Sequence, residues 1–224
     1  MATPAKRAAK RRPALTRDRV LRAAIRVADR DGIESLSMRN LGGKLGVQAM
    51  SLYNHVRNKE DMLDGMVDVV FSEIDLPASE TDWRTAMRKR AISVRQVLLR
   101  HPWANGLMES RTTPGPANLR HHNAVLGSLR GAGFSVDMAA HAYSILDSYI
   151  YGFTLTESTL PFRKPGDVAE VAENIIEGFR PGEYPLLAEM AVDRAMKPGY
   201  IYGDEFEYGL DLILAGIKRA QDSA

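Results

Sequence analysis

Positively charged side chains gather at one end of this 224-residue chain. Residues 1–59 carry fourteen Lys and Arg against four Asp and Glu, a formal charge of +10. Residues 60–224 carry sixteen basic and twenty-four acidic side chains, a formal charge of −8. This density of ammonium and guanidinium groups favours a polyanionic partner that is bound through one end only. A basic surface facing water alone is the plainer alternative, and charge by itself does not separate nucleic acid from an anionic membrane.

The sequence contains none of the common catalytic motifs. The chain has no cysteine, which excludes disulfides, thiolate zinc sites and a cysteine nucleophile. It contains no Gly-x-Gly-x-x-Gly, Walker A, His-Glu-x-x-His or Gly-x-Ser-x-Gly pattern. The adjacent His121 and His122 are too isolated to predict a metal site, so no metal is expected. An all-helical enzyme whose basic end binds an anionic substrate remains the alternative from another class.

The composition is that of a globular protein, with 26% charged and 45% hydrophobic residues. No run approaches the roughly 18 apolar residues of a membrane span. The basic N-terminus lacks the apolar stretch of a secretory signal. We therefore expect a cytoplasmic protein with no membrane partner.

Helix signals surround the most informative segment, residues 37–59. Ser37 is a candidate N-cap for a short helix, Gly46 supplies a turn, and the segment 48–55 follows as a second short helix. Gly42 lies where two such helices would cross closely. Apolar residues at helical spacing close a small core: Leu41, Leu45, Val47, Leu52 and Val56. This is the pattern of a helix-turn-helix, which holds its second helix out for the major groove. Any pair of short helices in a bundle is the alternative.

The rest of the chain repeats helical periodicity and shows no alternating strand pattern. We predict an all-α fold of nine or ten helices, in which an N-terminal three-helix DNA-binding head precedes a larger helical body. The predicted divisions are a disordered basic arm over residues 1–15, the head over 16–62, and a helical body over 63–224.

Residues 37–63 resemble the DNA-binding head of the TetR family of bacterial regulators. The most specific elements are Leu-Gly-Val at 45–47, Leu-Tyr-x-His-Val at 52–56 and Asn-Lys-Glu at 58–60. The body resembles the tetracycline-repressor-like branch more loosely, through His-Pro-Trp at 101–103, the loop 111–116, and the segments 146–153 and 206–217.

The resemblance implies two groups of DNA-contacting residues. Hydroxyl, imidazole and ammonium donors match positions that hold phosphates and set register: Ser37, Tyr53, His55 and Lys59. A second group matches positions that read bases, where Arg suits guanine, Gln suits adenine, and small apolar groups touch the thymine methyl: Arg39, Gln48, Ala49, Met50 and Ser51. Tetracycline repressors have glutamine, proline and tryptophan where this chain has Ala49, Met50 and Asn54, so its operator should differ. The arm residues Lys6, Arg7, Lys10, Arg11 and Arg12 either reach a neighbouring groove or form a nonspecific tail.

In the body, the resemblance implies a dimer built by two helices from each copy. The predicted interface residues are Ile150, Phe153, Phe206, Leu210, Ile213, Leu214 and Ile217. It also implies a cavity for a small molecule. The predicted lining residues, each of which is otherwise plain core, are Val94, Leu98, Trp103, Leu107, Met108, Tyr143, Asp147 and Tyr151.

Tetracycline itself is not the expected effector. Asp75, Arg90, Val94 and Met108 align with the histidine, asparagine, phenylalanine and histidine that grip magnesium-tetracycline in its repressors. Valine and methionine replace neither an aromatic wall nor an imidazole ligand.

The resemblance therefore implies a ligand-responsive repressor. We expect a homodimer that binds a palindromic double-stranded operator, is released by an unknown small-molecule effector, uses no cofactor and is not an enzyme. The alternative is a regulator of the same family, an activator or one controlled by a protein partner, with no small-molecule inducer.

Overall fold

The computed structural model describes residues 14–78, 82–108, 110–161, 167–180 and 182–223. Within these ranges the chain forms eleven α-helices and no β-strand, so the predicted all-α fold is confirmed. The count exceeds the nine or ten helices expected, and two of the eleven are one-turn segments, α3 (Ala49–Leu52) and α6 (Asn105–Met108). The predicted basic arm, with Lys6, Arg7, Lys10, Arg11 and Arg12, falls almost wholly in residues 1–13, outside the described part of the chain.

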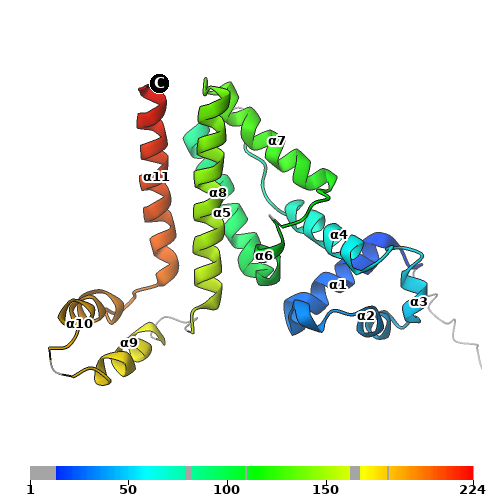
Figure 1. The fold of residues 1–224 in the computed structure, drawn as a ribbon, viewed down its shortest axis with the longest axis horizontal. Helices are drawn as coiled ribbons and strands as arrows, with labels where there is room; N and C mark the ends of the chain where they lie inside the picture. The colour runs from blue at the N-terminus through cyan, green and yellow to red at the C-terminus, as the bar shows by residue number, and fades with distance from the viewer. Residues whose placement is uncertain (1–13, 79–81, 109, 162–166, 181, 224) are drawn as a thin grey trace, which may run out of the picture.

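The head consists of α1 (Arg17–Asp31), α2 (Met38–Leu45) and α3, and it lies at the lower right of Figure 1. Side chains cap both longer helices, as expected: Thr16 Oγ1 accepts from the Arg19 amide, and Ser37 Oγ accepts from the Asn40 amide. Gly46 ends α2 in the left-handed conformation, with φ 68°.

The crossing of α2 and α3 depends on Gly42. A Cβ at this position would lie 3.0 Å from the Val47 carbonyl oxygen and 3.2 Å from the Ala49 amide nitrogen. Both neighbours are backbone atoms, so a larger residue would push the two helices apart. Glycine is therefore required here by close approach, as the sequence indicates.

Helix α4 (Lys59–Phe71) belongs to two hydrophobic cores at once. Its first half, with Met62 and Met66, packs into the head core against α1, α2 and α3. Its second half, with Val67 and Phe71, packs into the body core. The head core thus extends beyond residue 62, and a single rigid element connects the two parts.

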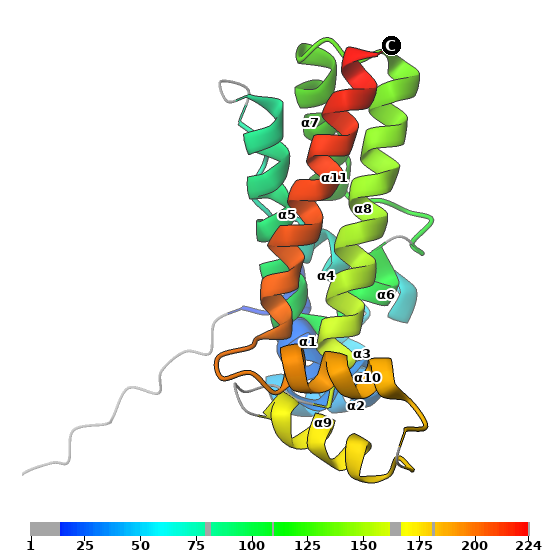
Figure 2. The ribbon, with the colours of Figure 1, turned by 90° about the vertical axis from the view of Figure 1, so that its left-hand side faces the viewer.

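The body is a bundle of antiparallel helices. Its elements are α5 (Trp83–Arg100), α6, α7 (Pro116–Gly131), α8 (Val136–Thr159), α9 (Asp167–Glu177), α10 (Pro185–Met190), a π-helical turn (Ala191–Ala195) and α11 (Glu205–Asp222). Helices α8 and α11 run side by side in opposite directions (Figure 1). They face the viewer in Figure 2, where no other described helix covers their upper length.

None of the described helices is long and apolar enough to cross a membrane. Over the same residues, no group of three or more His, Asp or Glu side chains is arranged to hold a metal ion.

Candidate functional site

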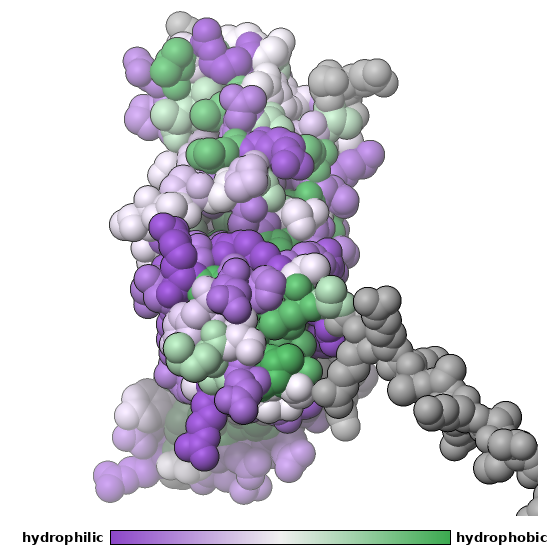
Figure 3. Space-filling model, turned by 90° about the vertical axis from the view of Figure 1, so that its right-hand side faces the viewer, coloured by the Kyte–Doolittle hydropathy of each residue, from purple (hydrophilic) through white to green (hydrophobic). Residues whose placement is uncertain are grey.

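The predicted DNA-contacting residues lie in α2, α3, the first turn of α4 and the short segments that precede and join these helices, on the side of the molecule away from α8 and α11 (Figure 1). Arg39, Gln48 and Lys59 are exposed. Met50 is 73% exposed and Tyr53 is 45% exposed, although both are large and apolar in part. The remaining members are exposed or half-buried: Ser37, Ala49, Ser51 and His55. Figure 3 views the molecule from this side, where hydrophilic side chains predominate and one hydrophobic area lies beside the grey trace.

Ser37 caps α2 and also keeps its side chain exposed. Its oxygen accepts the 3.1 Å hydrogen bond from the Asn40 amide that begins α2. Its side chain is nevertheless exposed, so the hydroxyl proton is available to a phosphate oxygen.

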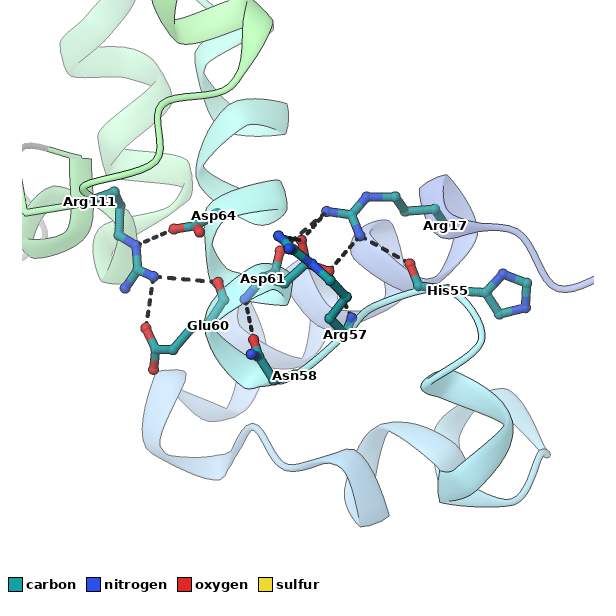
Figure 4. A network of polar contacts seen from close by, with 8 residues as sticks. All are labelled: Arg17, His55, Arg57, Asn58, Glu60, Asp61, Asp64 and Arg111. Atoms are coloured by element: carbon teal, nitrogen blue, oxygen red, sulfur yellow. Dashed lines mark hydrogen bonds and ion pairs between the residues drawn. The ribbon is translucent and has the colours of Figure 1, made fainter.

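A network centred on Asp61 holds the loop between α3 and α4, as Figure 4 shows. Arg17 of α1 donates to both Asp61 carboxylate oxygens, at 2.9 and 3.0 Å, and also to the carbonyl oxygen of His55 at 3.0 Å. The Arg57 amide donates to the same carboxylate at 2.8 Å, and Asn58 caps α4 by accepting from the Asp61 amide. The loop that carries Tyr53 and His55, and the start of α4 at Lys59, are therefore tied to α1.

The ionisation of Asp61 follows from these contacts. The hydrogen bond from Arg17, followed by the Arg57 amide and the charges of both arginines, lowers the pKa of Asp61 from 3.8 to about 2 against the opposing effect of burial. The carboxylate therefore stays charged at all physiological pH values.

Two further contacts join α4 to the body. Arg111 donates to Glu60 at 2.7 Å and to Asp64 at 2.6 Å (Figure 4). Asp68 accepts from the amides of Ala117 and Asn118, at 2.8 and 3.0 Å, and so caps the first turn of α7. The start of α7 and the loop before it thus move with α4.

A third junction joins α1 to the body. Asp29 accepts from His101 Nδ1 and from Trp103 Nε1, each at 2.7 Å. His101 Nε2 lies 3.2 Å from Glu73, just beyond α4. Burial raises the pKa of Glu73, but hydrogen bonds from Arg100 and His101 outweigh it, and the pKa is lowered. These partners lie far apart in the sequence, and no local motif predicts the junction.

The predicted effector residues divide into three groups. Val94, Leu98 and Met108 are buried in the body core. Tyr143 and Tyr151 are half-buried against it. Trp103 and Leu107 pack against both cores, so they lie at the junction between head and body.

The eighth predicted residue, Asp147, belongs to a buried polar cluster that the sequence does not reveal. Arg90 Nη2 lies 2.6 Å from Asp147 Oδ1, and Arg90 Nε donates to His121 Nε2 at 3.1 Å. Burial is the main cause that lowers the pKa of His121 from 6.5 to about 3, and the positive charge of Arg90 adds to it. His121 is therefore a neutral hydrogen-bonding group of the body interior.

Most residues of the predicted dimer interface face the core of the single chain. Five of its residues are already covered within the single chain and face its core: Ile150, Phe206, Leu210, Leu214 and Ile217. Phe153 is half-buried and stacks on Tyr202 at 5.0 Å, and Ile213 packs on the same core. Apolar periodicity in α8 and α11 identified the inward face, whose stripe is the more continuous of the two. The outward faces carry other apolar side chains that are 47–68% exposed: Ile145, Leu155, Tyr208 and Leu212.

Comparison with known proteins gives a consistent identification. The family model described as bacterial regulatory proteins, tetR family, matches residues 20–66. The model described as tetracyclin repressor-like, C-terminal domain, matches residues 76–220.

Individual relatives agree. An HTH-type transcriptional regulator of Saccharopolyspora erythraea is 37% identical over 79% of this chain and 75% of its own length. The HTH-type transcriptional repressor DrrR1 of Streptomyces coeruleorubidus is 32% identical over 92% of this chain and 78% of its own. The crystal structure of the Streptomyces coelicolor protein ActR in complex with actinorhodin superposes with a TM-score of 0.77 at 26% identity, covering 93% of this chain and 99% of that one. These relatives are transcriptional regulators rather than enzymes, and the chain belongs to the TetR family of DNA-binding transcriptional regulators.

Proposed function

We propose that this regulator is a homodimeric repressor that binds a palindromic operator and is released by a small-molecule effector. The observation that carries the proposal is the double membership of α4. Its Met62 and Met66 are core residues of the head, and its Val67 and Phe71 are core residues of the body. A rearrangement around Phe71 must therefore be accommodated by movement of the same helix that begins at the DNA-contacting surface.

The head offers the contacts that such a repressor needs. Exposed Arg39 and Gln48 supply bidentate hydrogen bonds to base edges, while Tyr53 and Lys59 supply phosphate contacts. The short α3 exposes Met50 rather than a long polar side chain, which suits apolar contact with a thymine methyl.

The outward face of α8 and α11 supports the homodimer. Tyr208 and Leu212 are one helical turn apart on α11, and Ile145 and Leu155 lie on α8 beside it. A second copy that packs its own α8 and α11 here by two-fold symmetry would cover these apolar side chains. Two heads related in this way would read a roughly palindromic site.

The similar proteins and the helical body support a small-molecule effector. ActR has been crystallised with actinorhodin, and DrrR1 is named as a repressor. By analogy, the body of this chain would select between two arrangements of the dimer. In one arrangement the two heads are spaced for the operator, and in the other they are not. An effector that binds the second arrangement more tightly than the first would shift the population away from the DNA-binding arrangement, by a coupling of typically about 1–3 kcal/mol.

The test begins with an operator selected from random duplex DNA. Compounds that raise the melting temperature of the protein are collected, and operator affinity is then measured by fluorescence anisotropy with and without each compound. The proposal expects two protomers per operator and at least one compound that weakens binding five-fold or more. Compounds that bind the body without changing operator affinity would instead favour the regulator without a small-molecule inducer.

A further inference from the structure

The polar cluster inside the body has incomplete bonding. The Arg90 side chain is 0% exposed and that of Asp147 is 8% exposed. Five of the cluster's buried polar atoms have no hydrogen-bond partner in the described part of the chain, and three of them also lie outside the Arg90–Asp147 ion pair: Arg90 Nη1, His121 Nδ1 and Asp147 Oδ2. The contact from Arg90 Nη2 to Asp147 Oδ1 is an ion pair without hydrogen-bond alignment. Buried polar groups are nearly always satisfied, so three such atoms in one place indicate a missing partner.

The protonation of the cluster follows from its geometry. The guanidinium of Arg90 only donates, so His121 Nε2 must accept and the ring proton must sit on Nδ1. The low pKa of His121 agrees with a neutral ring. Arg90 and Asp147 neutralise each other, and the cluster therefore presents two donors and one acceptor with no net charge.

The cluster lies beside aromatic rings and beside a cavity that has both apolar and charged walls. The Phe71 ring centroid lies 5.6 Å from that of His121 and 5.4 Å from that of His122. The Tyr143 oxygen lies 2.6 Å from His122 Nδ1. Arg90 also lines a cavity of about 320 Å³ beside the cluster, of which His121 and Asp147 are not walls; its other walls are Asp75, Leu76, Pro77, Ala78, Ala86 and Lys89. This volume falls at the lower end of small-molecule sites.

We propose that Arg90, His121 and Asp147 form the recognition point for the effector, and that the effector is an uncharged molecule with an apolar ring body carrying both a hydrogen-bond acceptor and a hydrogen-bond donor. The acceptor takes hydrogen bonds from Arg90 Nη1 or His121 Nδ1, and the donor gives one to Asp147 Oδ2. An anionic effector is disfavoured because Asp147 already balances Arg90 and would repel a second negative charge. This inference rests on the proposed function, because it assigns the class of the effector.

The position of the cluster gives the contact a consequence. Phe71 is the last residue of α4, and its ring touches His121 and His122. A molecule that completes the bonding of the cluster therefore acts on the body end of the helix whose other end begins at Lys59.

The test uses three naphthalene probes of equal shape on the full-length protein at pH 7, by isothermal titration calorimetry. They are 6-hydroxy-2-acetylnaphthalene (neutral, donor and acceptor), 6-hydroxy-2-naphthoate (anionic) and 2-acetylnaphthalene (no donor). We expect the first to bind at least ten-fold more tightly than either of the others, as a hydrogen bond to a buried charged group predicts.

Two variants and a control sharpen the result. Asp147→Asn leaves the Arg90 charge unbalanced, so the preference should reverse toward the naphthoate by ten-fold or more. The double variant Arg90→Met with Asp147→Leu replaces the ion pair by apolar groups that such sites often tolerate, and it should bind both ketones equally. Glu157→Gln alters the ion pair with Arg95, outside the cluster, and should keep the wild-type preference.

Equal probe preference in the wild type and in both cluster variants would overturn the inference, as would failure of all three probes to bind the wild type. If circular dichroism shows Asp147→Asn unfolded, the double variant decides alone. Selective binding that leaves operator affinity unchanged would reject effector release and leave the recognition chemistry standing.

Discussion

Replacing Asp61 by asparagine removes the carboxylate that ties the loop between α3 and α4 to α1. Arg17 loses a bidentate ionic partner, while the asparagine carbonyl retains one acceptor for either Arg17 or the Arg57 amide. The lowering of the Asp61 pKa from 3.8 to about 2 corresponds to roughly 2 kcal/mol of folding free energy. Arg17 is 45% exposed, so solvent screens part of this attraction, and we expect Asp61→Asn to cost about 1 kcal/mol at pH 7.

The contribution of the Asp61 carboxylate to folding stability should disappear in acid. The pKa of Asp61 is lower in the folded chain than in the unfolded chain, so its contribution is fully present above about pH 5. It is lost progressively as the pH falls through 4 and past 2, and it vanishes only below both pKa values, where both states are protonated. Wild type and variant should therefore differ most at pH 7 and converge below about pH 2.

The assay is urea unfolding followed by far-ultraviolet circular dichroism at pH 7, 4 and 3. Asp18→Asn is the matched control, because Asp18 pairs with Arg22 at a site where both side chains are at least 60% exposed, and it should cost less than about 0.5 kcal/mol. A difference between wild type and Asp61→Asn that stays constant from pH 7 to pH 3 would refute the assignment of the effect to the ionised carboxylate.

Three other predictions follow from the fold. Gly42→Ala should destabilise the chain by about 1–3 kcal/mol in thermal unfolding, because the added Cβ meets backbone atoms at the start of the next helix. Gly43→Ala is the control: its Cβ would have open space, so it should be neutral or stabilising. Equal effects of the two substitutions would contradict the close crossing of α2 and α3. Lys59→Ala should weaken binding to all DNA sequences alike and reduce the slope of log affinity against log salt concentration by about 1. Gln48→Ala should cost about 1–3 kcal/mol at particular base pairs in competition assays. A changed sequence preference for the lysine variant would contradict this assignment of roles. Leu212→Glu should convert the dimer to a monomer in sedimentation and reduce operator affinity ten-fold or more, and an unchanged dimer would place the interface elsewhere.

The head could be predicted from the sequence because its signals are local. Ser37 accepts a hydrogen bond from the amide three residues later and so caps α2. Gly46 ends α2 through its own left-handed backbone conformation. The core between α2 and α3 uses side chains from one short segment. Each of these depends on neighbours that the sequence places side by side.

The contacts between segments far apart in the sequence could not be predicted in the same way. Arg17 meets Asp61 and Arg90 meets Asp147 only after helices far apart in the sequence have packed. The proposed dimer face shows a different limit of sequence-based prediction. Leu210 and Leu212 lie two residues apart on α11, yet one is buried in the chain and the other is 58% exposed. Periodicity finds an apolar helix, but only packing decides which apolar side is already covered.

Selection of bound sequences from a random duplex library by the purified full-length protein tests the central claim most directly. At about 150 mM salt, a specific dimeric head predicts enrichment of one short palindrome whose half-sites are centred roughly one helical turn apart. Retention of DNA with no shared sequence would contradict base reading by Gln48 and Arg39, and enrichment of a single unrepeated half-site would contradict the two-fold dimer.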